Sequence, residues 1–239
     1  MNRRLYAIHR WISALAFLQL AAWTISGSFF VIMPIARVHG DHVDGAHDTV
    51  FAKNLGVLAP TVAIAIATES GISDVSNLEL RAAPSGALWY FVKGHEHVVR
   101  LDARTGAVAP VTREEAEETA RRDQPSAPRV VDAELLREPS IEYRGKPVPA
   151  WKVRLGNDAG MIVYVDARTG EVTARRNDVW RIYDFLWSLH IMDYGQRESF
   201  NHPLIIAAAA LALLTVSSGS VLWVVRIVRR LRKRAPAGT

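Results

Sequence analysis

Residues 101–108 read Leu-Asp-Ala-Arg-Thr-Gly-Ala-Val, and residues 165–172 read Val-Asp-Ala-Arg-Thr-Gly-Glu-Val. Six of the eight positions are identical across a gap of 64 residues, and both copies lie between two long apolar runs. Each copy follows a strand-prone lead-in, and Gly106 or Gly170 can supply the positive φ angle of a tight turn. This recurring strand–turn–strand signature predicts that one supersecondary unit was built twice.

The residues around the two copies predict a helix followed by antiparallel strands, twice. A short helix is expected from Leu58 to Glu69, with a strand as the competing prediction because the segment is rich in β-branched residues. A capping-box pattern at Thr112–Glu115 opens a second helix that runs to about Arg122. Strand-like segments cover 77–110, 130–136, 149–155 and 161–166. The order predicts an α+β domain over residues 37–178.

The tryptophans ahead of the two copies favour the same conclusion. Trp89 lies 16 residues before Thr105, and Trp151 lies 18 residues before Thr169. Because the two spacings are similar, we interpret them as a sign of a duplicated unit and not of a chance octapeptide.

Composition excludes several kinds of chemistry. The 239 residues contain no cysteine, which excludes disulfides, thiolate metal sites, cysteine nucleophiles and covalently attached c-type haem. No P-loop, dinucleotide fingerprint or Ser/His/Asp nucleophile context is visible. No complete active site can therefore be read from the sequence.

Two apolar segments, 11–35 and 203–225, are long enough to cross a bilayer, which takes about 20 residues. The first is too long for the apolar region of a cleaved signal peptide. The flanks 1–10 and 226–239 carry nine Lys and Arg and no acidic residue, whereas 37–200 carries 20 Lys and Arg against 24 Asp and Glu. The positive-inside rule predicts a two-pass protein of the bacterial inner membrane with both termini in the cytoplasm and 37–200 in the periplasm. The basic balance thus indicates membrane topology and not nucleic-acid binding.

Two further features belong to the predicted membrane region. Residues 180–200 begin with alternating aromatic and polar side chains, typical of an amphipathic helix at the outer membrane face. Small-residue clusters occur at 26–28, Ser-Gly-Ser, and at 217–220, Ser-Ser-Gly-Ser. We interpret both clusters as positions of close helix packing.

Together these residues carry a family resemblance. The two Asp-Ala-Arg-Thr-Gly units resemble the PepSY domain, and the flanking helices resemble those of PepSY-associated transmembrane (PepSY-TM) proteins. In that family the first helix opens with a motif similar to His9-Arg10-Trp11. The last helix follows a Leu-His pair, here Leu189-His190, and contains Ser/Thr-Gly, here Ser218-Gly219. The resemblance runs from about residue 5 to 228.

The resemblance implies two different functions. Soluble PepSY domains occur in peptidase propeptides and look like modules that regulate proteases. Larger PepSY-TM members, with four helices, look like metal reductases that hold b-type haem between helices through histidines. This chain has two expected spans and so resembles a reduced relative of those reductases. A homodimer would restore four helices.

Histidines at the ends of the spans are the candidate haem ligands. A histidine at a membrane span tends to be functional, and haem iron accepts a neutral imidazole. His9 is expected at the cytoplasmic face, whereas His190 and His202 are expected at the outer face, roughly 30 Å away. His9 and His190 therefore cannot ligate one haem within one chain. Two haems in a dimer, or one outer haem held by His190 and His202, remain open.

The remaining histidines give weaker signals. His39, His42 and His47 lie among aspartates just after the first span and suit a divalent metal, although their spacing matches no fixed template and a solvated loop is the simpler interpretation. His42 is also close enough in sequence to reach the outer haem site. His95 and His97 fall on a predicted strand, where we interpret them as polar surface.

The sequence favours a membrane protein that passes electrons through haem b to a ferric chelate or another oxidised metal species. With such short flanks, its electrons are expected from a cytoplasmic partner or from quinol. The alternative is a membrane-anchored PepSY module that binds a periplasmic peptidase or envelope partner and has no redox activity.

Overall fold

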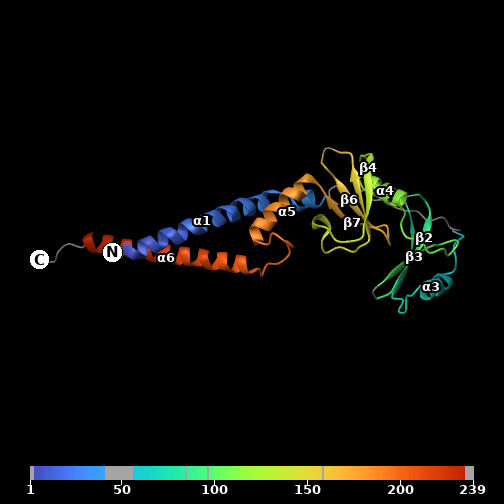
Figure 1. Ribbon diagram of the computed structural model, residues 1–239, viewed down its shortest axis with the longest axis horizontal. Helices are drawn as coiled ribbons and strands as arrows, with labels where there is room; N and C mark the ends of the chain where they lie inside the picture. Colours follow the sequence, from blue (N-terminus) through green and yellow to red (C-terminus); the bar gives the residue numbers. More distant parts are fainter. Residues whose placement is uncertain (1–2, 41–55, 84, 96, 158, 235–239) are drawn as a thin grey trace. The chain divides into compact units, whose positions relative to one another are not determined.

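The computed structural model describes residues 3–40, 56–83, 85–95, 97–157 and 159–234 (Figure 1). The chain divides into two compact units. One is made of Met1–Pro34 together with Ile182–Thr239 and is helical, and the other is Ile35–Arg181 and carries both β-sheets.

The helical unit contains two helices that are long and apolar enough to cross a membrane. α1 runs Arg3–Ile32 and α6 runs Pro203–Arg234, and the two pack against each other (Figure 1). Their apolar stretches, Tyr6–Ile32 and Pro203–Leu231, have mean hydropathies of 1.7 and 2.1. Both expected spans are therefore helical, and the first helix begins several residues before position 11.

A shorter helix, α5 (Asp178–Ile191), presents an aromatic face to α1. The rings of Tyr183, Trp187 and His190 lie 4.7, 5.9 and 5.4 Å from that of Phe30, measured between centroids. Their spacing of four and three residues places them on one side of the helix. The aromatic pattern that predicted an amphipathic helix thus serves helix–helix packing, and its position at a membrane face stays a prediction.

The first half of the sheet-bearing unit is a helix packed on a three-stranded antiparallel sheet. Its elements are α3 (Pro60–Glu69), β1 (Asn77–Ala82), β2 (Leu88–Lys93) and β3 (Val98–Asp102), with strand order β1-β2-β3. Ala63 and Ala67 of α3 are buried against Tyr90 and Leu101 of the sheet. The helix predicted for Leu58–Glu69 is confirmed over Pro60–Glu69, so the competing strand is wrong.

The second half repeats this plan with one more strand. Its elements are α4 (Arg113–Arg122), β4 (Val130–Leu136), the short 3-10 helix η2 (Ile141–Tyr143), β5 (Ala150–Leu155), β6 (Ile162–Asp166) and β7 (Val172–Arg176), with strand order β4-β5-β6-β7. Ala116 and Ala120 of α4 are buried against Val153 and Val163. The predicted capping box is confirmed: the Thr112 side chain accepts from the backbone N–H of Glu115, and the Glu115 side chain accepts from that of Thr112. The α+β class is thereby confirmed.

The two octapeptide copies form the same turn. Asp102 Oδ1 accepts hydrogen bonds from the backbone N–H groups of the Arg and Thr that follow it, at 2.9 and 2.8 Å. Asp166 Oδ1 does the same in the second copy, at 2.7 and 3.1 Å. Gly106 and Gly170 have φ angles of 77° and 75°, which side-chain-bearing residues rarely adopt. Identical local chemistry therefore builds identical turns.

The tryptophan spacing does not reflect a structural correspondence. Trp89 pairs with the aspartate of the first copy, whereas the residue before Trp151 pairs with the aspartate of the second. The counterpart of Trp151 is Tyr90, one residue further along its strand. The Tyr90 hydroxyl donates to Leu58 O at 2.8 Å, and Trp151 Nε1 donates to Val111 O at 3.0 Å. Each half thus ties the lead-in of its helix to its sheet with an aromatic donor.

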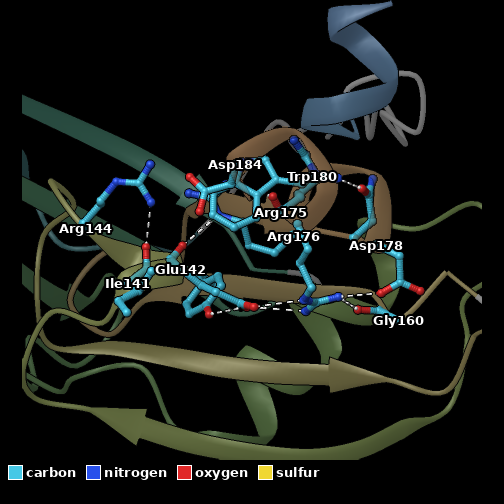
Figure 2. A network of polar contacts seen from close by, with 12 residues as sticks. Ile141, Glu142, Arg144, Gly160, Arg175, Arg176, Asp178, Trp180 and Asp184 are labelled. Atoms are coloured by element: carbon cyan, nitrogen blue, oxygen red, sulfur yellow. Dashed lines mark hydrogen bonds and ion pairs between the residues drawn. The ribbon is translucent and has the colours of Figure 1, made fainter. Parts of the chain in front are cut away.

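Arg181 bonds the first turn of α5 to η2 and to the connection between β5 and β6. Figure 2 shows its partners Glu142, Gly160 and Asp178. Its Nε donates to Glu142 Oε1, and its Nη1 donates to both Gly160 O and Asp178 Oδ1, each at 2.9 Å. One guanidinium thus serves three partners, all within the sheet-bearing unit.

Candidate histidine sites

Two histidines of the helical unit each bond a serine on a facing helix. His9 on α1 places Nδ1 2.7 Å from Ser218 Oγ on α6. His190 on α5 places Nδ1 2.8 Å from Ser26 Oγ on α1. Both imidazoles are half-buried. The two small-residue clusters therefore receive histidines as well as packing helices.

A glycine follows each of these serines and leaves room for the ring. A Cβ at Gly219 would lie 3.2 Å from Cε1 of His9, closer than the 3.5–4.0 Å at which carbon atoms normally sit. A Cβ at Gly27 would lie 4.0 Å from Cε1 of His190, which is ordinary contact. The Ser-Gly pair thus supplies both a hydrogen-bond partner and the space that the ring occupies, and this space is tighter at His9.

The backbone around His190 is fixed by side chains of α1. Trp23 Nε1 donates to the carbonyl of His190 at 2.8 Å, and Gln19 Nε2 donates to that of Leu189 at 3.3 Å. These are among the last carbonyls of α5, which have no partner inside their own helix. Phe30 meets the imidazole edge-on at 69°. Side chains of α1 therefore hold His190 both through its backbone carbonyl and through its ring.

The second nitrogen of each ring is less engaged. Nε2 of His9 lies 3.4 Å from Ser13 Oγ, a long contact for a hydrogen bond. Nothing among the described residues hydrogen-bonds Nε2 of His190. A neutral imidazole held through Nδ1 and open at Nε2 is a donor group that suits haem iron and other metal centres.

The two sites lie at opposite ends of α1. His9 and Ser26 are separated by 17 residues of one helix, or ~25 Å at the rise of an α-helix. His9 and His190 are therefore too far apart to ligate one haem within a chain, as the sequence predicts.

His202 forms no common site with His190 in the part of the chain that is described. Its Nδ1 accepts from Leu204 N at 3.3 Å at the start of α6. An open hollow around residues 192–202 is lined by His202 and Met192 but not by His190. A single outer haem held by His190 and His202 therefore finds no support in the contacts.

The remaining histidines form no further site among the described residues. His39 is exposed at the end of α2 (Ile35–His39), and His42 and His47 lie outside the described residues. His95 and His97 lie in the connection between β2 and β3, so the strand predicted for them is wrong. Among the residues that the structure describes, no group of three or more His, Cys, Asp or Glu side chains is placed to hold a metal ion.

The sheet-bearing unit has a cavity of about 210 Å³. It lies where the outer face of the first sheet meets α4 and the second octapeptide turn, and its lining includes Trp89, Phe91 and Glu115. Arg100 stacks on Trp89 at 3.4 Å from the ring centroid and donates to Glu115 at 2.9 Å. The charges that border this cavity are thus already paired within the protein.

The fold of the second half, one helix over an antiparallel sheet, defines a compact α+β domain, and comparison with known families identifies it. Residues 110–176 match the PepSY family, described as "Peptidase propeptide and YPEB domain". This part of the chain is a PepSY domain, and together with the two candidate membrane helices it supports the resemblance to PepSY-TM proteins. The match begins after the first half, which shares the turn and the element order. Searches of curated proteins and of solved structures found no match.

Sequence reasoning found the histidines but missed their partners. Ser26 and Ser218 each stand in a cluster with other serines, and the sequence does not show which hydroxyl faces a ring. The signal that was available is the shared Ser-Gly order of the two clusters.

Proposed function

We propose that this membrane-anchored PepSY protein holds b-type haem at both ends of its helical unit and passes electrons through it. The observation that carries the proposal is the repeated geometry of His9 and His190, each held through Nδ1 by a serine of a facing helix. Haem would supply the one-electron chemistry, and His9 and His190 would hold it through imidazoles oriented by their serine partners.

The donor set fits haem if two copies of the chain combine. Each end of the described helical unit offers one suitably held imidazole, whereas bis-histidine ligation needs two. A homodimer would bring the same histidine of a second copy to each end and give two haems per dimer, one for each membrane face. The first half of the sheet-bearing unit would be a second, divergent PepSY unit, supported by the identical turns.

The direction of electron flow follows from the predicted topology. Electrons from a cytoplasmic donor or from quinol would enter at the His9 end and leave at the His190 end. The acceptor outside would be a ferric chelate or another oxidised metal species. The rings of Phe30 and Trp23, 5.4 and 6.4 Å from the imidazole of His190, would give that end an aromatic surrounding.

The visible absorption spectrum of the full chain tests this function. Purified from haem-sufficient cells, it is expected to be red with a reducible Soret band. His9→Ala and His190→Ala are each expected to remove about half of the haem, because each leaves the other end intact. His95→Ala, in a loop of the other unit, is the matched control and should keep the spectrum. A colourless wild-type protein would reject the proposal.

A second candidate function is a PepSY binding module, favoured by the cavity between the first sheet and α4. Here the helices are only anchors, and a peptidase or envelope protein would dock beside Phe91. A photo-crosslinker placed at Phe91 should then give one discrete adduct in cells, also when His9 and His190 are both alanine. Absence of any adduct would count against this candidate.

A further inference from the structure

We infer that Ser26 and Ser218 fix His190 and His9 as the tautomers that carry their proton on Nδ1. Their role toward haem rests on the proposed function, but the tautomers themselves follow from hydrogen bonds within the helical unit alone. Both serines are thus positioning residues, because they act through the histidines.

The argument for Ser26 depends on its single hydroxyl proton. Its Oγ lies 2.7 Å from the carbonyl oxygen of Ala22. Two oxygens at that distance need a hydrogen between them, and only the hydroxyl can supply it. The proton of Ser26 is therefore used on the backbone of α1. The 2.8 Å contact with His190 must then be a bond in which Nδ1–H donates to Oγ.

Ser218 repeats this arrangement at the other end. Its Oγ lies 3.1 Å from the carbonyl oxygen of Thr215 and 2.7 Å from Nδ1 of His9. By analogy with Ser26 we assign the hydroxyl proton to the carbonyl, so that Nδ1–H of His9 donates to Oγ. The 3.4 Å contact between Ser13 Oγ and Nε2 of His9 is compatible with either tautomer, because a hydroxyl can donate to a bare Nε2 or accept from Nε2–H. Among the described residues no such contact is made to Nε2 of His190, so that nitrogen is more open there.

The consequence is that both rings present an Nε2 lone pair before any ligand arrives. A free neutral imidazole divides its population between two tautomers, and only one of them offers Nε2 as a ligand. A serine that accepts from Nδ1–H removes this ambiguity and makes Nε2 a stronger donor. Loss of such an outer partner typically lowers metal affinity about 10–100-fold.

NMR of the imidazole nitrogens in the full chain, labelled at histidine and held in detergent micelles, tests the tautomers directly. Wild-type His9 and His190 are expected to be protonated on Nδ1. Ser26→Ala should return only His190 to a mixture, and Ser218→Ala only His9. Ser28→Ala and Ser217→Ala remove exposed neighbouring hydroxyls that bond neither ring and should change nothing. Protonation of the wild-type rings on Nε2 would overturn the inference.

Haem titration of the same variants separates this inference from the proposed function. Ser26→Ala and Ser218→Ala are expected to weaken haem binding about 10–100-fold at one end each, and Ser→Thr, which keeps the hydroxyl, should restore it. A wild-type chain that binds no haem but shows both Nδ1–H tautomers would reject the function and keep the inference. A wild-type chain that binds haem but carries Nε2–H rings when haem-free would keep the proposed function and reject the inference.

Discussion

At the scale of single residues, the histidine sites are built from neighbours whose size and hydrogen count leave few alternatives. A hydroxyl has one proton, a carbonyl has none, and a glycine has no Cβ. These three facts orient both rings of the helical unit. In the PepSY domain, the rings of Tyr143 and Tyr164 stack at 4.5 Å between centroids, and both residues are buried.

Because the space beside His9 is tighter than that beside His190, replacing the neighbouring glycine by alanine should have a larger effect at His9. Gly219→Ala is expected to displace the His9 ring and to destabilise the helix pair by about 1–3 kcal/mol, the usual effect of overpacking, because its Cβ would lie 3.2 Å from the ring. Gly27→Ala is the matched control, because its Cβ would lie at 4.0 Å. NMR shifts of the two imidazoles and unfolding in detergent measure both effects. Equal shifts at His9 and His190 would contradict the geometry.

Burial predicts a late ionisation of Tyr164. Loss of solvent raises the pKa of its hydroxyl to about 12, and the nearby charge of Glu142 acts in the same direction. Because the folded pKa lies above the ordinary value of 10, the contribution to stability is complete below pH 10 and is lost as the pH rises toward 12. Tyr164→Phe should remove this loss, seen as a flatter alkaline limb of unfolding and a missing late step in tyrosinate absorbance. An unchanged titration would refute this account.

At the scale of elements, α5 shows how one helix can carry two kinds of contact. Its first turn is held by the ion pair of Arg181 with Glu142 in the sheet-bearing unit, and its last turn is held by Gln19 and Trp23 of α1.

Removing the guanidinium of Arg181 should loosen the first turn of α5 from η2 and from the β5–β6 connection. Arg181→Ala is expected to lower the unfolding free energy of the PepSY domain by about 1–2 kcal/mol, a value reduced because the pair is about one-third exposed. Arg181→Lys should recover only part of this, because an ammonium cannot reproduce the planar fork. Hydrogen exchange of residues 178–181 provides the measurement. Full protection in Arg181→Ala would show that the fork is dispensable.

How far the sequence predicts these elements depends on how local their causes are. The octapeptide turns and the capping box follow from residues within one turn of chain, and both are confirmed. The prediction that Trp89 and Trp151 occupy equivalent positions is wrong. The connection between β5 and β6 is longer than that between β2 and β3, so similar spacings in the sequence lead to different positions on the strands. The choice of Ser26 and Ser218 from among their neighbours depends on the rotation of packed helices, which no local pattern specifies.

At the scale of the whole molecule, a PepSY domain and two candidate membrane helices fit a membrane-anchored PepSY protein. Its octapeptide repeat lies in the sheet-bearing unit, whereas the proposed haem chemistry belongs to the helical unit. The two proposed functions therefore concern different units of one chain, and variants in one unit need not affect the function of the other.

The central claim is that the histidine sites hold haem, and the ratio of haem to chain in the purified full-length protein tests it most directly. A dimer with one bis-histidine haem at each end contains one b-type haem per chain. Binding of that amount, halved by either His9→Ala or His190→Ala, is the predicted result. A wild-type chain from haem-sufficient cells with no Soret absorption would contradict the claim.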